Sequence, residues 1–143
     1  MNKKICIIDY GIGNLLSIER AIEKLGYQAA ITNDKKIILD STHLILPGVG
    51  AFGKAMESIK NLKLDRILKE CAENNKFILG ICLGMQLLAA ESVEDKFTKG
   101  LGIIPNKVKK FTLKKQKTKF HMLVLIRFFL KKKISYLRAF HQE

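Results

Sequence analysis

The segment FILGICLGMQLL, residues 77–88, decides the fold expected for this chain. It begins as a short apolar run typical of a buried strand and ends as the start of a helix. In the turn between them, Gly80 and Gly84 lie two residues on either side of Cys82. A glycine-x-nucleophile-x-glycine turn in this context is typical of a nucleophile elbow, which lifts the reactive atom above the end of a parallel sheet. The segment therefore predicts a parallel α/β fold with Cys82 at the edge of its sheet.

The spacing of the two glycines has a steric reason. The backbone of the nucleophile must be strained, and only residues without a β-carbon let the strand and the helix pass so closely. The positive end of the helix after Cys82 is expected to favour a thiolate. Its free N–H groups, that of Leu83 first, are expected to hold a developing oxyanion.

A second interpretation of Cys82 is a small buried hydrophobic residue. Most single cysteines with apolar neighbours are of this kind, and Cys6 and Cys71 fit that description. The strand before Cys82 and the helix after it favour the nucleophile, because they are the context that the elbow requires.

The rest of the chain supports an α/β architecture. Apolar runs and their spacing predict strands at residues 4–10, 27–32, 43–46 and 107–111, helices at 15–25 and 62–74, and loops at 91–99 and 100–105. The order β-α-β-β-α-β-α through residue 90 predicts an open, mostly parallel, flavodoxin-like sheet with helices on both faces.

Two glycine-rich turns follow predicted strands. Residues 47–53 carry three glycines at the carboxyl end of a strand, where open α/β sheets bind ligands and where glycine N–H groups can point at an anion. The alternative for this loop is a flexible turn. Gly11 and Gly13 suggest dinucleotide binding, but position 16 is Leu and the third glycine of that fingerprint is absent, so a tight turn is favoured.

Composition narrows the class of protein. A chain of 143 residues with 48% hydrophobic and 27% charged residues is typical of one globular domain. Three cysteines at irregular positions indicate neither a disulfide framework nor a zinc site, so we expect a reduced, cytoplasmic compartment. We expect no signal peptide, because the apolar run that starts at Ile5 stops at Asp9, and no stretch approaches a membrane span.

The net charge of +13 is concentrated near the end of the chain. Residues 1–113 hold 17 Lys/Arg and 12 Asp/Glu, whereas residues 114–143 hold 9 and 1. The body of the chain is therefore only mildly basic, and nucleic acid is not an expected partner. Binding of nucleic acid through the basic tail is the weakest of the alternatives considered.

Four ordered segments together resemble the class I glutamine amidotransferases, most closely the glutaminase subunits of imidazole glycerol phosphate synthases. They are Asp9-Tyr10-Gly11-Ile12-Gly13-Asn14-Leu15, Leu46-Pro47-Gly48-Val49-Gly50-Ala51-Phe52, Gly80-Ile81-Cys82-Leu83-Gly84-Met85-Gln86 and Gly100-Leu101-Gly102-Ile103-Ile104-Pro105. The resemblance extends to Met122. It implies a partial amidotransferase domain at 1–122, with a sheet incomplete at its carboxyl-terminal side, and an atypical tail at 123–143.

The resemblance also implies chemistry. Cys82 would attack the side-chain amide of L-glutamine, giving a thioester and ammonia, and no cofactor or metal is needed. Gly48, Val49, Gly50 and Leu83 would form the oxyanion site, and Gln86 would help hold the substrate. Ammonia would pass to a barrel-fold cyclase subunit of a heterodimer in histidine biosynthesis.

The chain departs from the family pattern in its histidines. Family members place a general base and its carboxylate on a His-Pro-Glu segment well beyond residue 122, and this chain has none. His43 precedes a strand and is expected to be structural. His121 matches a family histidine near the partner interface, and His141 lies at the terminus, where fraying is expected. Without the base, we expect very low turnover of glutamine.

Residues 123–143 leave three interpretations open: a basic amphipathic element, a buried strand, or a tail that arose from a lost reading frame near residue 120. We favour the last, because a Lys/Phe/Leu/Ile-rich tail is typical of an A/T-rich gene read out of frame. Two further alternatives concern function. The chain could be an amidotransferase subunit for a surface-sugar pathway, or a catalytically dead remnant that keeps only the partner-binding face.

Overall fold

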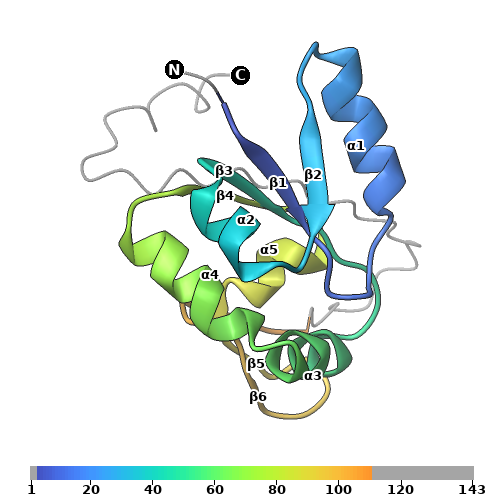
Figure 1. Ribbon diagram of the computed structural model, residues 1–143. Helices are drawn as coiled ribbons and strands as arrows, with labels where there is room; N and C mark the ends of the chain where they lie inside the picture. Colours follow the sequence, from blue (N-terminus) through green and yellow to red (C-terminus); the bar gives the residue numbers. More distant parts are fainter. Residues whose placement is uncertain (1–2, 111–143) are drawn as a thin grey trace, which may run out of the picture.

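The computed structural model describes residues 3–110 of the chain. Its elements, in order, are β1 (Ile5–Ile8), α1 (Leu15–Lys24), β2 (Ala29–Thr32), α2 (Lys35–Asp40), β3 (His43–Leu46), α3 (Phe52–Asn61), α4 (Leu64–Glu73), β4 (Phe77–Gly80), α5 (Leu83–Leu87), β5 (Ala89–Ser92), β6 (Thr98–Lys99) and β7 (Ile104–Val108) (Figure 1).

The main sheet has the strand order β2-β1-β3-β4, and every neighbouring pair is parallel. Ile7 pairs with Ile45, and Ile45 pairs with Leu79. The strands are short apolar runs, as expected for a sheet covered on both faces. The prediction of an open, parallel α/β sheet is confirmed, and all four carboxyl ends lie at one edge.

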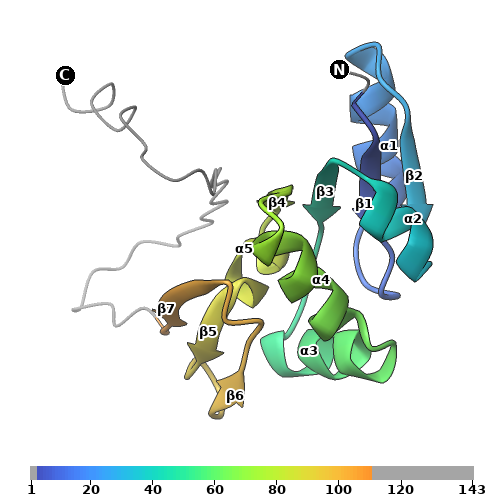
Figure 2. The same cartoon turned by 60° about the vertical axis from the view of Figure 1, so that its left-hand side comes forward.

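Helices lie on both sides of this sheet (Figure 2). Alternate strand residues point to opposite faces, so Cys6, Ile8 and Leu44 share one face. They join a single buried cluster with Ile38 of α2 and Leu68 of α4. Helix α1 contacts β1 and β2 but contributes no residue to the buried cluster, so it covers the other face.

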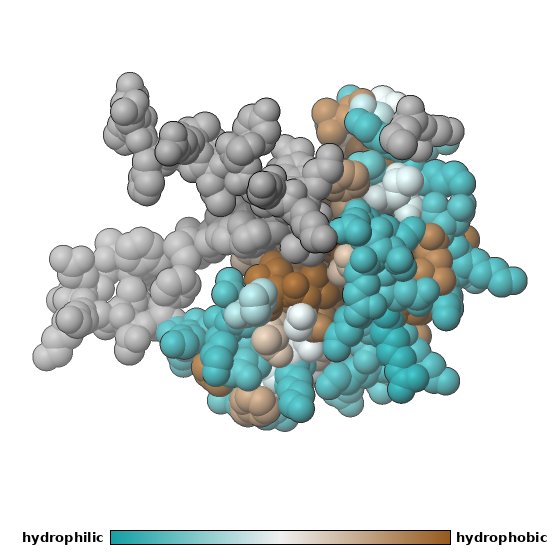
Figure 3. Space-filling view, turned by 90° about the vertical axis from the view of Figure 1, so that its left-hand side faces the viewer, coloured by the Kyte–Doolittle hydropathy of each residue, from teal (hydrophilic) through white to brown (hydrophobic). Residues whose placement is uncertain are grey.

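Residues 3–110 cover that second face less completely over β3 and β4. On it, His43 lies opposite Phe77 and Ile45 lies opposite Leu79. All four residues are half-buried. Figure 3, which looks toward the side of the molecule that is on the left in Figure 1, shows hydrophobic residues gathered near its centre between hydrophilic borders.

Two helices were absent from the sequence-based prediction. We expected no helix between the strands at 27–32 and 43–46, but Asp34 caps α2 by accepting the N–H groups of Lys36 and Ile37. We also expected a loop to residue 53 and a helix only from 62, whereas α3 starts at Phe52. The buried residues of α3 recur at helical spacing, but Gly53 in its first turn weakened the signal.

A second, smaller sheet follows α5. It has the order β6-β5-β7, in which β5 is antiparallel to β6 and parallel to β7. The loop expected at residues 91–99 is confirmed only at 93–97, because β5 runs through Ser92 and β6 spans Thr98–Lys99. The strand expected at 107–111 lies earlier, at Ile104–Val108, and three of its five residues are exposed.

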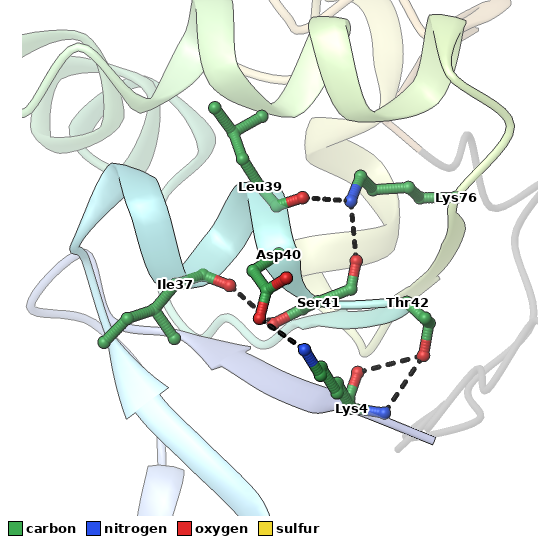
Figure 4. Close-up of polar contacts among 7 residues, drawn as sticks. All are labelled: Lys4, Ile37, Leu39, Asp40, Ser41, Thr42 and Lys76. Atoms are coloured by element: carbon green, nitrogen blue, oxygen red, sulfur yellow. Dashed lines mark hydrogen bonds and ion pairs between the residues drawn. The ribbon is translucent and has the colours of Figure 1, made fainter. Parts of the chain in front are cut away.

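Lys76 joins the loop before β4 to the end of α2 (Figure 4). Its ammonium group donates to the carbonyl oxygens of Leu39 and, at 2.7 Å, of Ser41. The last carbonyls of a helix lack intrahelical donors, so a cation placed there both satisfies them and interacts favourably with the helix dipole. Lys4 forms a different contact nearby, an exposed 2.6 Å ion pair with Asp40.

We predict that Lys76→Met lowers the free energy of unfolding by about 1–3 kcal/mol, because partly buried carbonyls lose a charged donor. Lys4→Met is the matched control. Its ion pair is solvated, with side-chain exposures of 55% and 70%, so we expect no measurable change. Urea unfolding followed by circular dichroism measures both variants. If both variants lost the same free energy of unfolding, the bridging role of Lys76 would be contradicted.

Candidate active site

Cys82 lies in a strained turn directly between β4 and α5. Its backbone has φ 54° and ψ −118°, a combination that residues with a β-carbon rarely adopt. Within residues 3–110, only Lys63 and Asn75 are other non-glycine residues with positive φ. The strained strand–turn–helix geometry predicted for an elbow is confirmed.

The two glycines that flank Cys82 permit this turn. A β-carbon on Gly80 would lie 2.5 Å from Cα of Met85, and one on Gly84 would lie 1.8 Å from the carbonyl oxygen of Leu46. The same Leu46 carbonyl accepts the N–H of Ile81 at 2.9 Å. The elbow is thus packed directly against the end of β3, and any side chain at residue 84 would displace it.

The three cysteines differ sharply in exposure. Cys82 is exposed, whereas Cys6 and Cys71 are fully buried. The alternative that Cys82 is a small buried hydrophobic residue is therefore wrong. The same interpretation is confirmed for Cys6 and Cys71. Burial, together with a smaller effect of nearby Cys71, raises the pKa of the Cys6 thiol to about 11 even though a hydrogen bond with Ser41 opposes the shift.

The loop after β3 packs against the elbow. A β-carbon on Gly48 would lie 2.7 Å from the backbone nitrogen of Gly84 and 3.0 Å from Cβ of Leu83. Gly50 has φ 88° and open space around it. Among the residues described, no acceptor receives the N–H groups of Gly48, Val49, Gly50 or Leu83. Unpaired N–H groups beside an exposed thiol form an arrangement that can bind an anion.

The β1–α1 turn lies beside the same loop. A β-carbon on Gly13, which has φ 133°, would lie 3.3 Å from Cβ of Pro47. Asp9 closes the turn by accepting the N–H of Gly11 at 2.9 Å. The turns after β1, β3 and β4 therefore meet at the carboxyl edge of the sheet, as open α/β sheets require for a binding site.

Sequence reasoning missed Tyr10 as a residue of this site. Tyr10 is fully buried, and its hydroxyl donates to the carbonyl oxygen of Pro47 at 2.6 Å. Burial raises the pKa of Tyr10 well above its usual range, and the nearby charge of Cys82 raises it further, so the hydroxyl stays protonated. Tyr10 stands in one of the segments that resemble the family, but an aromatic residue at the end of a predicted strand is equally typical of an ordinary core residue.

Gln86 lies on α5, one turn beyond Cys82, and is half-buried. Its N–H donates to the carbonyl oxygen of Cys82 at 3.4 Å, which is a long hydrogen bond. Its predicted role in holding the substrate stays a prediction.

His43 is remote from Cys82. It begins β3 and pairs with Phe77 at the start of β4, whereas Cys82 follows the other end of that strand. Its ring stacks on Phe77 at 4.7 Å, and its Nδ1 lies 2.8 Å from the Thr42 hydroxyl. Partial burial, and secondarily Lys3, lowers the pKa of His43. These contacts fit the structural role expected for it.

The other two histidines, His121 and His141, lie outside the described residues, as does the tail at 123–143. Residues 3–110 thus bring no histidine to Cys82. Over the same range, no cluster of three or more His, Cys, Asp or Glu residues is placed to hold a metal ion. Nor does that part of the chain form a helix long and apolar enough to cross a membrane.

A cavity of about 680 Å³ opens between α3 and the β5–β6 turn, next to the glycine loop. It is lined by Gly50, Ala51, Phe52, Gly53, Lys54, Met56, Glu57, Lys60, Asn61, Ser92, Glu94, Asp95, Lys96 and Thr98. Side chains of both charges line it, which suits a ligand with a positive and a negative group. Cys82 is not among its lining residues, so the cavity adjoins the elbow only through the glycine loop.

We predict that Gly84→Ala lowers the free energy of unfolding by more than about 3 kcal/mol, because the added methyl group collides with the Leu46 carbonyl. Gly26→Ala is the matched control. Gly26 also has positive φ, 79°, but nothing lies within 4 Å of its added β-carbon, so only about 1 kcal/mol of backbone strain is expected. Chemical denaturation measures both. Similar losses would show that the close contact at residue 84 is unimportant.

We predict that one thiol reacts in the native chain and three react in urea. At pH 8, a maleimide reagent should modify Cys82 within minutes, while Cys6 and Cys71 react at least about 100-fold more slowly because they are buried. Intact mass and peptide mapping identify the modified residue. Native modification of Cys6 at a similar rate would contradict the burial described here.

The sequence comparisons agree with this geometry. The family model described as "Glutamine amidotransferase class-I" matches residues 6–141. Proteins named imidazole glycerol phosphate synthase subunit HisH are similar to the chain: that of Bacillus cytotoxicus is 50% identical over 106 residues, covering 74% of this chain and 51% of the relative. That of Listeria innocua is 51% identical over 106 residues, covering 74% of this chain and 51% of the relative. That of Carboxydothermus hydrogenoformans is 48% identical over 105 residues, covering 73% of this chain and 53% of the relative.

One solved structure, described as a glutamine amidotransferase, superimposes with a TM-score of 0.62 at 20% identity, covering 71% of this chain and 54% of the other. This likeness shows the fold. The chain spans about half the length of the curated relatives it matches. Since the family model matches most of its length and the predicted fold and elbow are both present, the chain belongs to the class I glutamine amidotransferase family.

Proposed function

We propose that the chain is the ammonia-donating subunit of an imidazole glycerol phosphate synthase and that its substrate is L-glutamine. The observation that carries this proposal is the position of Cys82, exposed in a strained elbow against a loop of unpaired N–H groups. The similarity to proteins named as subunits of that synthase supports the choice of acceptor pathway.

In the proposed reaction, Sγ of Cys82 attacks the side-chain amide carbon of glutamine. A C–S bond forms, and the carbonyl oxygen gains a negative charge that the N–H groups of Leu83, Val49 and Gly50 can stabilise by donating hydrogen bonds to it. The C–N bond then breaks, and the nitrogen leaves as ammonia after taking up a proton. Water hydrolyses the thioester to release glutamate and restore the thiol.

The remainder of the substrate is an amino acid with one ammonium and one carboxylate group. The cavity beside Gly50 and Ala51 carries carboxylates from Glu57, Glu94 and Asp95 and ammonium groups from lysines. Its mixed charge supports its assignment as the region that receives this end of glutamine. Gln86, on the helix after the nucleophile, is proposed to orient the amide.

The proposed partner is a barrel-fold cyclase subunit that consumes the ammonia in a heterodimer. The names of the relatives describe a subunit of a synthase, which supports an assembly of this kind. We also propose a cytoplasmic location, which is supported by free rather than disulfide-bonded cysteines.

A second candidate is a catalytically dead subunit that binds the partner without hydrolysing glutamine. The observation that favours it is the position of His43, the only histidine in residues 3–110, at the far end of the sheet from Cys82. A cysteine nucleophile is normally activated by an adjacent base. A base for Cys82 must therefore come from outside the described residues if the chain is active.

We predict that the full chain releases ammonia from L-glutamine slowly when mixed with a barrel cyclase subunit of the synthase, because residues 3–110 bring no histidine to Cys82, and that Cys82→Ala abolishes this release. Cys71→Ala, which removes a buried thiol on α4, is the matched control and should retain the rate if the variant is folded. Coupled glutamate dehydrogenase detection measures the product ammonia.

Three outcomes separate the candidates. Activity that depends on Cys82 supports the glutaminase. Stable binding to the cyclase subunit without ammonia release supports the dead subunit. Activity retained in Cys82→Ala would contradict both, because the reaction would then occur elsewhere.

A further inference from the structure

We propose that Tyr10 is a positioning residue for the glycine loop, and that its hydroxyl holds the Pro47–Gly48 peptide in the one orientation that presents the loop's N–H groups beside Cys82. The effect on the reaction rests on the proposed function, whereas the effect on the orientation of the loop can be tested separately. Tyr10 lies just after β1, the strand adjacent to β3, outside the elbow and outside the glycine loop.

The contact itself is buried and directional. Tyr10 has no exposed surface and belongs to the main hydrophobic cluster, yet its hydroxyl reaches the Pro47 carbonyl at 2.6 Å. A buried tyrosine hydroxyl normally has a partner, because an unpaired polar group in the core is costly. Here the partner is the loop that follows β3, so the hydrogen bond joins the end of β1 to that loop.

Tyr10 is anchored at its backbone as well. The hydroxyl of Ser58, on α3, donates to the carbonyl oxygen of Tyr10. Asp9, the residue before it, holds the following turn through the N–H of Gly11. The tyrosine is therefore fixed from the strand and from α3, and its hydroxyl is a rigid donor rather than an adaptable one.

Planarity of the peptide bond transmits this contact to the loop. In a trans peptide, the C=O of Pro47 and the N–H of Gly48 point in opposite directions. With the carbonyl directed at the Tyr10 hydroxyl, the N–H of Gly48 must point away from Tyr10. That N–H, like those of Val49 and Gly50, donates to no acceptor within residues 3–110.

Steric contacts make the arrangement specific. The Tyr10 hydroxyl lies 2.7 Å from the position that a β-carbon on Gly48 would occupy, and Gly84 lies equally close on another side. Gly50, by contrast, has open space and φ 88°. A loop with glycines at both of these positions can rotate its peptide planes at low cost. The hydrogen bond from the Tyr10 hydroxyl is the buried contact that selects one orientation of the Pro47–Gly48 peptide.

The hydroxyl can act as a donor over the whole working range of pH. Burial raises the pKa of Tyr10, and the charge of a Cys82 thiolate raises it further. Formation of the thiolate therefore strengthens the protonated state of the tyrosine instead of removing the donor.

The first test measures loop orientation in the full chain without any substrate. Tyr10→Phe keeps the ring and removes only the hydroxyl. We expect the ¹⁵N–¹H NMR signals of Gly48 and Val49 to shift or broaden well beyond those of β1 and α4, because the Pro47–Gly48 peptide is no longer held in one orientation by the Tyr10 hydroxyl. Unchanged loop signals would overturn the proposal.

The second test measures the reactivity of Cys82 toward two electrophiles at a fixed alkaline pH. One is the chloromethyl ketone of glutamine, in which –CO–CH₂Cl replaces the amide. The thiolate forms a C–S bond, and chloride leaves as the C–Cl bond breaks. The other is methyl methanethiosulfonate, which has no carbonyl group and reports only access and thiolate content. We expect Tyr10→Phe to slow the first reaction about ten-fold and the second less than two-fold.

Tyr27→Phe is the matched control, because it removes an exposed tyrosine hydroxyl that contacts Lys3 before β2, at the opposite edge of the sheet from the loop. It should leave the ratio of the two labelling rates unchanged. Equal slowing of both reagents in Tyr10→Phe would indicate a general structural role and overturn the proposal. If the native chain shows no preference for the L over the D chloromethyl ketone, the proposed function fails, and the NMR signals of the loop still decide the role of Tyr10.

Discussion

The contact between Gly84 and the carbonyl end of β3 is the constraint on which the site depends. A β-carbon at residue 84 would lie only 1.8 Å from the Leu46 carbonyl oxygen. That approach lets the first turn of α5 cross the end of β3 and places Cys82 at the edge of the sheet with φ 54°. The same approach brings Gly48 against Gly84 and Leu83. One close backbone crossing thus sets both the position of the thiol and the position of the loop beside it.

The strain of the elbow is offset by the packing around it. Leu83 and Leu87 of α5 are buried in the same cluster as Leu46 and Ile78 from the two strands that meet there. A residue keeps unfavourable backbone angles where the packing energy of the surrounding structure exceeds the energetic cost of those angles. The buried residues around Cys82 provide that fixation, and the thiol itself is exposed at the surface.

Much of this arrangement could be predicted from residue patterns. The runs at β1 and β3 are continuous and apolar, and the spacing of glycines around Cys82 leaves few backbone alternatives, so the parallel sheet and the elbow were both expected. Helix α2 was missed because it has only six residues and depends on the Asp34 cap more than on hydrophobic spacing. Strand β5 was missed because Glu91 pairs with Lys107 across the sheet, a stabilising contact that single-segment polarity does not reveal.

The sequence by itself determined the parallel α/β class, the position of Cys82 in the elbow and the family, since those depend on local pattern and on glycines at fixed spacing. Only the tertiary structure decided which groups surround that cysteine. Pro47 lies 37 positions after Tyr10, and Ser58 lies 48 positions after it, yet both form hydrogen bonds with Tyr10. Contacts between residues so far apart depend on how the strands align in the sheet and how α3 packs on it, which no local pattern specifies.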